Sequence, residues 1–193
     1  MSSGFFDTRL RFTGDGPAFD ASLHEVLLVV GAAREVGTLT YGVKLGGIVA
    51  GELAAKGQTY AIEPGLVVGV SLDWRVLSAP RDAVSLTLGL QLGVAWSSVA
   101  PEVGAGPLDD RWLTFDARAS ATVSRTFFGR LTPYASVRLF GGPALWGGAA
   151  GGDKTHVQLA AGLALAVTDA LSLHVEGALL AERGAFAGLG LAF

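Results

Sequence analysis

A strict alternation of apolar residues with small or polar ones is the feature that most constrains how this chain can fold. Between residues 83 and 97, every second residue is Val, Leu or Trp, and the residues between them are Gly, Ala, Ser, Thr or Gln. Residues 112–124 and 155–167 repeat the pattern. Because a period of two places successive side chains on opposite faces, each stretch predicts a β-strand with one apolar face.

The strands predicted in this way are long, about 11–14 residues, whereas strands of globular proteins average about 5–6. A tilted strand that crosses a membrane needs about 9–11 residues for the hydrocarbon layer alone. Half of the residues are hydrophobic and 16% are charged, with a mean hydropathy of +0.47. No stretch reaches the roughly 18 consecutive apolar residues of a membrane-spanning helix. Two classes remain: a soluble protein with a large core, or a barrel whose apolar face meets lipid.

The composition of the two faces decides between these classes. A soluble, lipocalin-like barrel has apolar residues inside and polar residues outside. In this chain the face rich in Leu and Val has no polar interruption, while the other face holds Gly, Ala, Ser and most of the charges. Small and charged residues cannot fill a soluble core. The pattern therefore favours a transmembrane barrel with a polar lumen.

We predict one domain, residues 1–193, that folds as a closed antiparallel up-and-down transmembrane β-barrel. Single-chain bacterial barrels have an even number of strands. An eight-stranded barrel with an irregular N-terminal part stays open, because residues 26–30 are apolar on both faces. The ten predicted strands lie near residues 4–13, 21–33, 37–53, 59–75, 83–98, 111–126, 130–146, 154–168, 171–182 and 185–193.

The predicted connections alternate between long and short. Longer loops follow the odd-numbered strands, as at 100–110 and 147–153, and tight turns follow the even-numbered ones, as at 128–129 and 169–170. Short periplasmic turns and longer external loops are usual in these barrels, so both termini are expected in the periplasm. Aromatic residues collect at membrane interfaces. The predicted interface belt consists of Tyr41, Trp74 and Phe193 on the turn side and Tyr60 and Trp96 on the loop side.

Residues 132–142, 156–180 and 185–193 resemble the closing strands of small Gram-negative outer-membrane barrels of the OmpA/OmpW-like kind, and Ala187, Leu189, Leu191 and Phe193 match the alternating terminal strand of that family. The resemblance implies an integral protein of the bacterial outer membrane whose last strand is read by the barrel-assembly machinery. We expect residues 1–193 to lack the periplasmic domain of that family. Because residues 1–6 lack the features of a secretory signal, we expect that a signal peptide has already been removed.

Charged residues on the predicted inner face form the candidate site. A charge buried without a partner is costly, so these residues should pair with one another. We hypothesise a network in which Arg9 and Arg11 reach Glu176 and Arg138 across Gly188 and Gly190. The predicted lumen charges are Arg9, Arg11, Lys44, Glu63, Asp73, Asp116, Arg118, Arg138 and Glu176.

No residue pattern predicts catalysis, a metal or a cofactor. The three histidines do not converge, and Ser172, His174 and Glu176 lie along one strand rather than around a reacting atom. The chain has no cysteine, no phosphate-binding loop and no zinc motif. We find no polar cluster on the predicted outward face, and the strands look too short to carry an active site above the membrane. Net charge is −3 without a basic run, which argues against a nucleic-acid partner.

We therefore expect a non-enzymatic envelope protein, either structural or a subunit of an assembly, with a charge-networked lumen. The alternative is a narrow pore for ions or small solutes, in which the lumen charges act in selectivity or gating. A lipid-modifying outer-membrane enzyme is a third reading. The expected partners are outer-membrane lipid or lipopolysaccharide, the barrel-assembly machinery and other envelope proteins.

Overall fold

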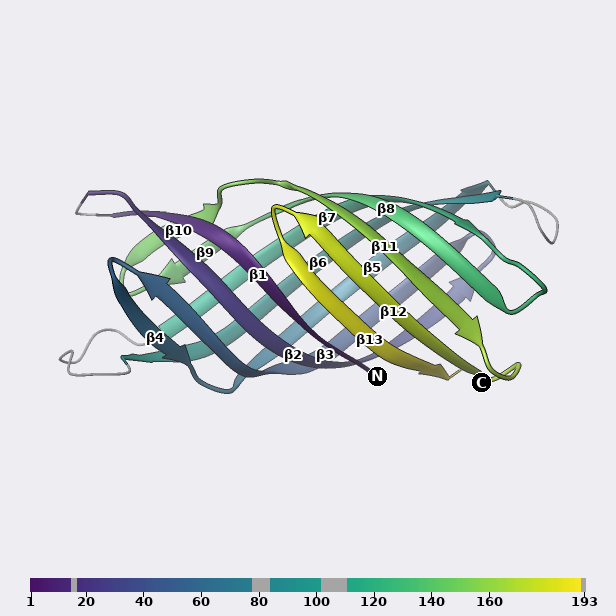
Figure 1. The fold of residues 1–193 in the computed structure, drawn as a ribbon, viewed down its shortest axis with the longest axis horizontal. Coiled ribbons are helices and arrows are strands. Elements are labelled where there is room, and N and C mark those ends of the chain that lie inside the picture. Colours follow the sequence, from purple (N-terminus) through teal and green to yellow (C-terminus); the bar gives the residue numbers. More distant parts are fainter. Residues whose placement is uncertain (15–16, 78–83, 102–110, 192–193) are drawn as a thin grey trace.

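The computed structural model describes residues 1–14, 17–77, 84–101 and 111–191. Within these ranges the chain forms one antiparallel sheet that closes on itself (Figure 1). No helix in the described part is long and apolar enough to cross a membrane. The strands are β1 Ser2–Thr13, β2 Phe19–Val36, β3 Leu39–Ala55, β4 Gln58–Ile62, β5 Gly65–Leu77, β6 Val84–Pro101, β7 Arg111–Arg125, β8 Leu131–Gly141, β9 Pro143–Trp146, β10 Ala149–Asp153, β11 Val157–Ala166, β12 Leu171–Leu180 and β13 Arg183–Leu191.

The barrel has two tiers with different strand numbers. In the wide tier, ten of the described strands form a ring in the order β1, β2, β3, β5, β6, β7, β8, β11, β12 and β13, and β13 pairs with β1 to close it. This ring confirms the predicted up-and-down barrel. In the narrow tier, at the left in Figure 1, the ring contains eight described strands: β1, β2, β3, β4, β6, β7, β9 and β10.

The β12–β13 hairpin accounts for the change from ten strands to eight. It turns at Ala181 and Glu182, part-way up the wall. Beyond this turn, β10 pairs directly with β1, from Leu10 opposite Asp153 to Thr13 opposite Ala150. The chain thus adds one hairpin to the wide tier, between β11 and β1.

Two predicted strands are broken, and one predicted loop is wrong. The stretch 59–75 is divided into β4 and β5 at residues 63–64, and 130–146 is divided into β8 and β9 at Gly142. The expected loop at 147–153 is a two-residue turn followed by β10. Gly147 and Gly148 have φ of 55° and 78° there, which suits a tight hairpin because glycine adopts positive φ without strain. The expected loop at 100–110 lies mostly outside the described residues.

A bulge in β3 changes which side chains face inward. Val26 pairs with Ala50 and Leu27 with Ile48, so that Val49 has no partner on β2. Because side chains alternate along a strand, one extra residue exchanges the two faces beyond it. Residues of even number face inward up to Ile48, and residues of odd number do so from Gly51 to Ala55.

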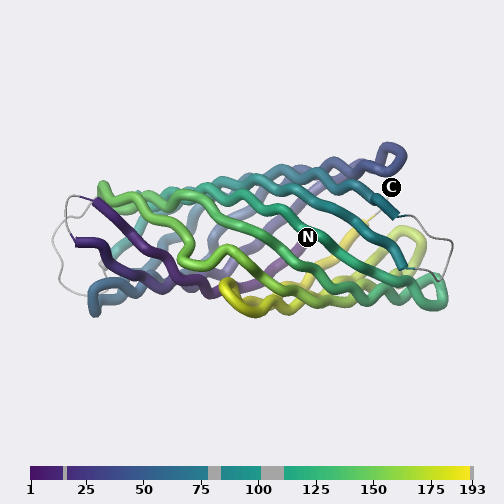
Figure 2. The backbone as a smooth tube through the Cα atoms, turned by 90° about the horizontal axis from the view of Figure 1, so that it is seen from above, coloured from purple at the N-terminus to yellow at the C-terminus, as the bar shows by residue number. Residues whose placement is uncertain are grey.

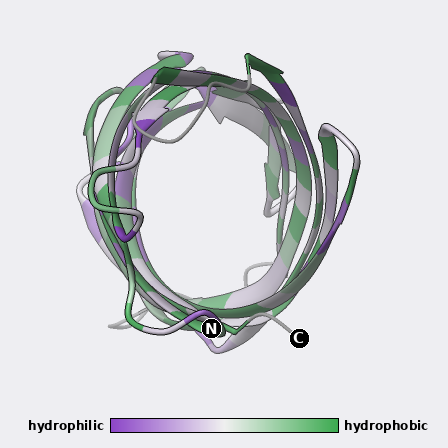
Figure 3. Ribbon diagram, turned by 90° about the vertical axis from the view of Figure 1, so that its right-hand side faces the viewer, coloured by the Kyte–Doolittle hydropathy of each residue, from purple (hydrophilic) through white to green (hydrophobic). Residues whose placement is uncertain are grey.

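The described strands run obliquely around the barrel (Figure 2), and green and purple alternate along them when the barrel is viewed from its wide end (Figure 3). The inside of the wide tier carries mostly small and polar residues, such as Ser, Thr and Gly of β6 and β7. The inside of the narrow tier holds the main apolar core. The two tiers therefore have opposite interiors, and the candidate site lies where they meet.

Candidate functional site

The narrow tier is filled by a compact group of buried apolar side chains, which we call the plug. Phe12, Leu53 and Trp112 are completely inaccessible to solvent. The ring of Phe12 stacks on Phe19 at 5.2 Å and lies 6.3 Å from Trp112. The plug consists of Leu10, Phe12, Ala21, Leu23, Ile48, Leu53, Ala55, Tyr60, Ile62, Val99, Trp112 and Ala144.

Tyr60 belongs to the plug, so its predicted place in the outer aromatic belt is wrong. It points inward, is 6% exposed and packs edge-on against Trp146 at 4.8 Å. Its hydroxyl donates to Gln58 at 2.7 Å. The interior of an eight-stranded ring is just wide enough for side chains to fill. In the narrow tier, the apolar environment for an aromatic side chain is therefore inside the barrel.

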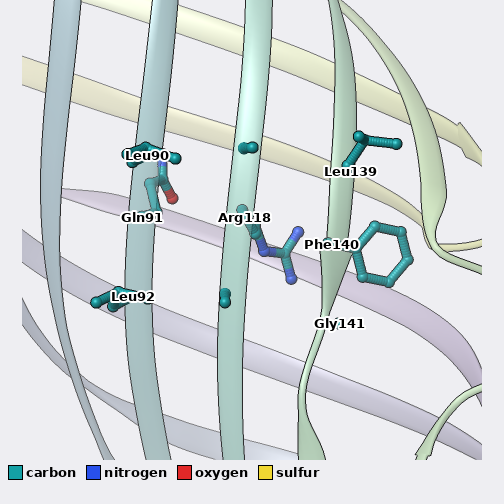
Figure 4. Close-up of a pocket in the computed structure, with 9 residues that line it drawn as sticks. Leu90, Gln91, Leu92, Arg118, Leu139, Phe140 and Gly141 are labelled. Atoms are coloured by element: carbon teal, nitrogen blue, oxygen red, sulfur yellow. The ribbon is translucent and has the colours of Figure 1, made fainter.

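A layer of charged groups lies next to the plug. The indole nitrogen of Trp112 donates to the buried carboxylate of Glu25 at 3.2 Å. Arg118 donates two hydrogen bonds to Glu182, at 2.5 and 2.9 Å, and a third to Asp116 at 2.5 Å. Figure 4 shows Arg118 between Gln91 and Phe140 of the neighbouring strands. Glu182 comes from the turn of the β12–β13 hairpin, so this ion pair ties the end of the inserted hairpin to β7.

A second bidentate ion pair continues the layer. Arg138 of β8 donates to both carboxylate oxygens of Glu176 at 2.7 and 2.6 Å, and the hydroxyl of Tyr134 donates to Glu176 at 3.0 Å. Gln158 joins the two pairs: it accepts from Arg138 at 3.2 Å and donates to Glu182 at 2.8 Å. Among the described residues, every buried side-chain nitrogen or oxygen has a hydrogen-bond partner. We call Asp116, Arg118, Tyr134, Arg138, Gln158, Glu176 and Glu182 the lumen network.

Four of the nine predicted lumen charges meet in this network: Asp116, Arg118, Arg138 and Glu176. Two others face inward but stand apart from it. Lys44 donates to Gln91 at 3.4 Å, and a carboxylate oxygen of Asp73 lies 2.5 Å from the position that a Cβ atom on Gly89 would take.

The prediction was wrong for Arg9, Arg11 and Glu63. Arg9 and Arg11 are exposed on the outside of β1, because the apolar residues of that strand, among them Leu10 and Phe12, enter the plug. Glu63 is exposed in the break between β4 and β5. The hypothesised contact of Arg9 and Arg11 with Glu176 is therefore also wrong.

A row of polar side chains lies on the outer face where the two tiers meet. Arg183, Asp7, His24 and Glu52 are direct neighbours on β13, β1, β2 and β3. The next row towards the wide tier is apolar and consists of Ala185, Phe5, Val26 and Ala50. The expectation that the outward face has no polar cluster was therefore wrong, and the bulge in β3 is what brings Glu52 into this row.

Two close polar contacts lie in this outer region. The Nδ1 atom of His24 is 2.6 Å from Asp7, and Lys154 donates to Asp20 at 2.7 Å. Asp20 lies beyond the polar row, outside the apolar belt. The hydrogen bond from Lys154 holds the pKa of the Asp20 carboxyl below its ordinary value.

The outer face of the wide tier is an apolar belt. Leu90, Leu92 and Val94 of β6 are exposed there, as are the corresponding residues of the other strands. Of the predicted interface aromatics, Tyr41, Trp74 and Trp96 do point outward, and Trp96 is 62% exposed. Phe193 lies outside the described residues. An apolar belt with aromatic side chains at its borders is typical of barrels that cross a membrane.

Sequence reasoning missed Glu25, Tyr134, Gln158 and Glu182 as site residues. The signal for Glu182 was its place at the end of a predicted strand, where a turn can fold a carboxylate inward. Glu25 lies in the run 19–27, whose odd positions hold Phe, Ala, Leu and Leu apart from this one acid. No group of His, Cys, Asp or Glu in the described part is arranged to hold a metal ion.

No protein-family model matches the chain, and no curated protein matches it. Among solved structures, the transport unit of the autotransporter AIDA-I from Escherichia coli is similar over the whole of this chain and 90% of that one, with 10% identity and a TM-score of 0.52. The β domain of the Bordetella autotransporter BrkA has 18% identity, covers 100% of this chain and 98% of its own, and has a TM-score of 0.45. The NanC porin has 13% identity, full coverage of both chains and a TM-score of 0.37. Of these three structures, the AIDA-I transport unit has a TM-score above 0.5. At 10% identity this similarity supports the barrel fold alone.

Proposed function

We propose that this chain is an integral protein of the bacterial outer membrane that acts as a sealed, non-enzymatic envelope component, either structural or a subunit of an assembly. The apolar belt and the barrel fold support the membrane placement. The similarity of the last predicted strand to OmpA/OmpW-like barrels supports the outer membrane in particular.

The main support for a sealed barrel is the plug. An ion that crosses the barrel has to pass the narrow tier, where Phe12, Leu53 and Trp112 leave no accessible side-chain surface. Moving a charge through such an apolar layer is costly because nothing there replaces its hydration shell. The lumen network lies next to this layer and ties four strands and the β12–β13 turn together. Both features favour a rigid, closed barrel over a channel.

Single-channel recording in planar bilayers tests the proposal. We expect purified wild-type protein to give no steady open level. The double variant F12S/W112S should create openings because it removes two fully buried rings from the plug. The matched control F5S changes a phenylalanine on the outer face of the same strand and should stay silent.

A steady wild-type open level that is abolished by R138M or E176Q would overturn the proposal in favour of a narrow pore. Incubation of the same protein with outer-membrane lipid addresses the enzymatic reading. We expect the lipid to stay unmodified, and turnover of the lipid would contradict the non-enzymatic assignment.

A further inference from the structure

Arg9 lies at the centre of a group of basic side chains on the outside of the barrel. Arg11 follows it on the same face of β1. On one side of β1, the backbone nitrogen of Lys154 donates to the carbonyl of Arg9 at 3.0 Å. On the same side but nearer the wide tier, Arg183 of β13 is opposite Asp7. All four basic residues are exposed, and pairing places them at neighbouring positions on the outer face.

The acidic residues nearby leave the three arginines available. Asp7 is engaged by His24, and Asp20 by Lys154. Glu52 stands opposite His24 on β3, and two strands, β1 and β2, separate it from Arg183. Asp20 is the cross-strand neighbour of Arg11, but its carboxylate pairs with Lys154. Within the described ranges, none of Arg9, Arg11 and Arg183 has a carboxylate within 4 Å.

The position of this basic group relative to the membrane follows from the border of the apolar belt. Arg183 and Asp7 stand directly beside Ala185 and Phe5, the first outward apolar row. In a membrane this boundary coincides with the headgroup layer, which lies next to the hydrocarbon. The guanidinium fork matches phosphate oxygens in a bidentate geometry, and it is more weakly hydrated than an ammonium group.

We propose that Arg9, Arg11 and Arg183, assisted by Lys154, form a binding site for the phosphate groups of an anionic lipid headgroup in the leaflet that surrounds the narrow tier. The acyl chains of this lipid run down beside Phe5 and Val26. The site rests on the proposed membrane placement and is independent of the sealed lumen. It gives the barrel a lipid contact on one defined side, at β13, β1 and β2.

Native mass spectrometry of the detergent-solubilised full chain measures the site directly. The test variant is R9Q/R11Q/R183Q, and the matched control is R34Q, which removes an exposed arginine at the opposite end of β2. Each protein is titrated with diphosphorylated lipid A and, separately, with zwitterionic phosphatidylethanolamine. A juxtamembrane arginine contributes about 1 kcal/mol to anionic lipid attraction, or about fivefold in affinity. We expect the triple variant to bind lipid A about 100-fold more weakly, R34Q to stay within about twofold, and phosphatidylethanolamine to be insensitive.

The electrophoretic mobility of each unheated variant shows whether the barrel has folded. If the triple variant has not folded, the single variant R9Q replaces it, with an expected loss of about fivefold in lipid A affinity. Unchanged lipid A affinity in a folded arginine variant would overturn the proposal, as would an equal loss in R34Q. Competition by inorganic phosphate at equal concentration would assign the site to free phosphate instead and contradict the lipid assignment. Conductance recorded on the same preparation separates this result from the sealed-lumen proposal, because the outer arginines point away from the plug, on the other face of the wall.

Discussion

Phe5 and Phe12 of β1 give the sharpest test of the plugged narrow tier, because they lie on one strand but face opposite ways. Phe12 is fully buried and has aromatic neighbours at 5.2, 6.0 and 6.3 Å. Replacing a core phenylalanine with alanine costs about 3–5 kcal/mol, and each lost aromatic pair adds about 0.5–1.5 kcal/mol to a purely area-based value. We therefore expect F12A to lower the free energy of unfolding by about 4–5 kcal/mol. Phe5 is 42% exposed on the outer face. Lipid can fill the space left by F5A, so its cost should be at most about 2 kcal/mol.

Equilibrium unfolding by urea in phospholipid vesicles measures this difference. The fraction folded is read from the mobility of unheated samples on a gel, because Trp112 next to Phe12 would alter a fluorescence signal independently of stability. A cost of F12A below about 1 kcal/mol, or one no larger than that of F5A, would refute the inward orientation of Phe12 and the plug built on it.

The ion pair of Arg138 and Glu176, which are 20% and 11% exposed, should show strong coupling. We expect R138M and E176Q each to cost about 3 kcal/mol in the same unfolding assay, because each leaves a buried charge or polar group unpaired, and the double variant to cost about 2 kcal/mol less than their sum. The half-exposed pair of Arg75 and Glu35 is the control, with an expected coupling below about 1 kcal/mol; equal coupling in both pairs would contradict a dry lumen network. At the outer surface, the Asp20 carboxyl should titrate below its ordinary pKa in an NMR pH series, and K154M should return it towards that value. Because the folded-state pKa is lowered, any stability from this pair is present above the unfolded pKa and is lost as the pH falls through the folded value. An Asp20 titration that K154M leaves unchanged would remove the role given to the Lys154 hydrogen bond.

The predictable part of the fold was the part where one face meets an apolar surround over a long stretch. On β6 the residues expected outward, from Leu86 to Trp96, are outward, and Arg118 and Asp116 of β7 are inward as expected. The prediction failed where the wall extends past the apolar belt. There the outside faces water and the inside must be dry, so the rule that apolar residues point outward is reversed for Phe12 and Tyr60.

The candidate site was predictable to the same extent. Arg138 and Glu176 could be brought together from strand order and register, since both lie in regular strands that pair with the two edges of β11. Arg9 and Arg11 could not, because alternation shows that two sets of residues are on opposite faces without showing which set is inside. The polar row on the outside could not be predicted either, because a single bulged residue, Val49, moves Glu52 to the outer face, and no sequence pattern marks that bulge.

The sequence by itself determined that this chain is a closed barrel of long antiparallel strands with an apolar belt, because period-two alternation over such lengths is compatible with little else. Only the tertiary structure decided that the barrel narrows from ten described strands to eight, that its narrow tier is plugged, and that Arg9 and Arg11 are outside. The physical reason is that these properties depend on where the β12–β13 hairpin stops within the wall. The end of this hairpin relative to its neighbours is set by pairing between β1 and β10, whose paired residues are 137 to 143 positions apart in the chain.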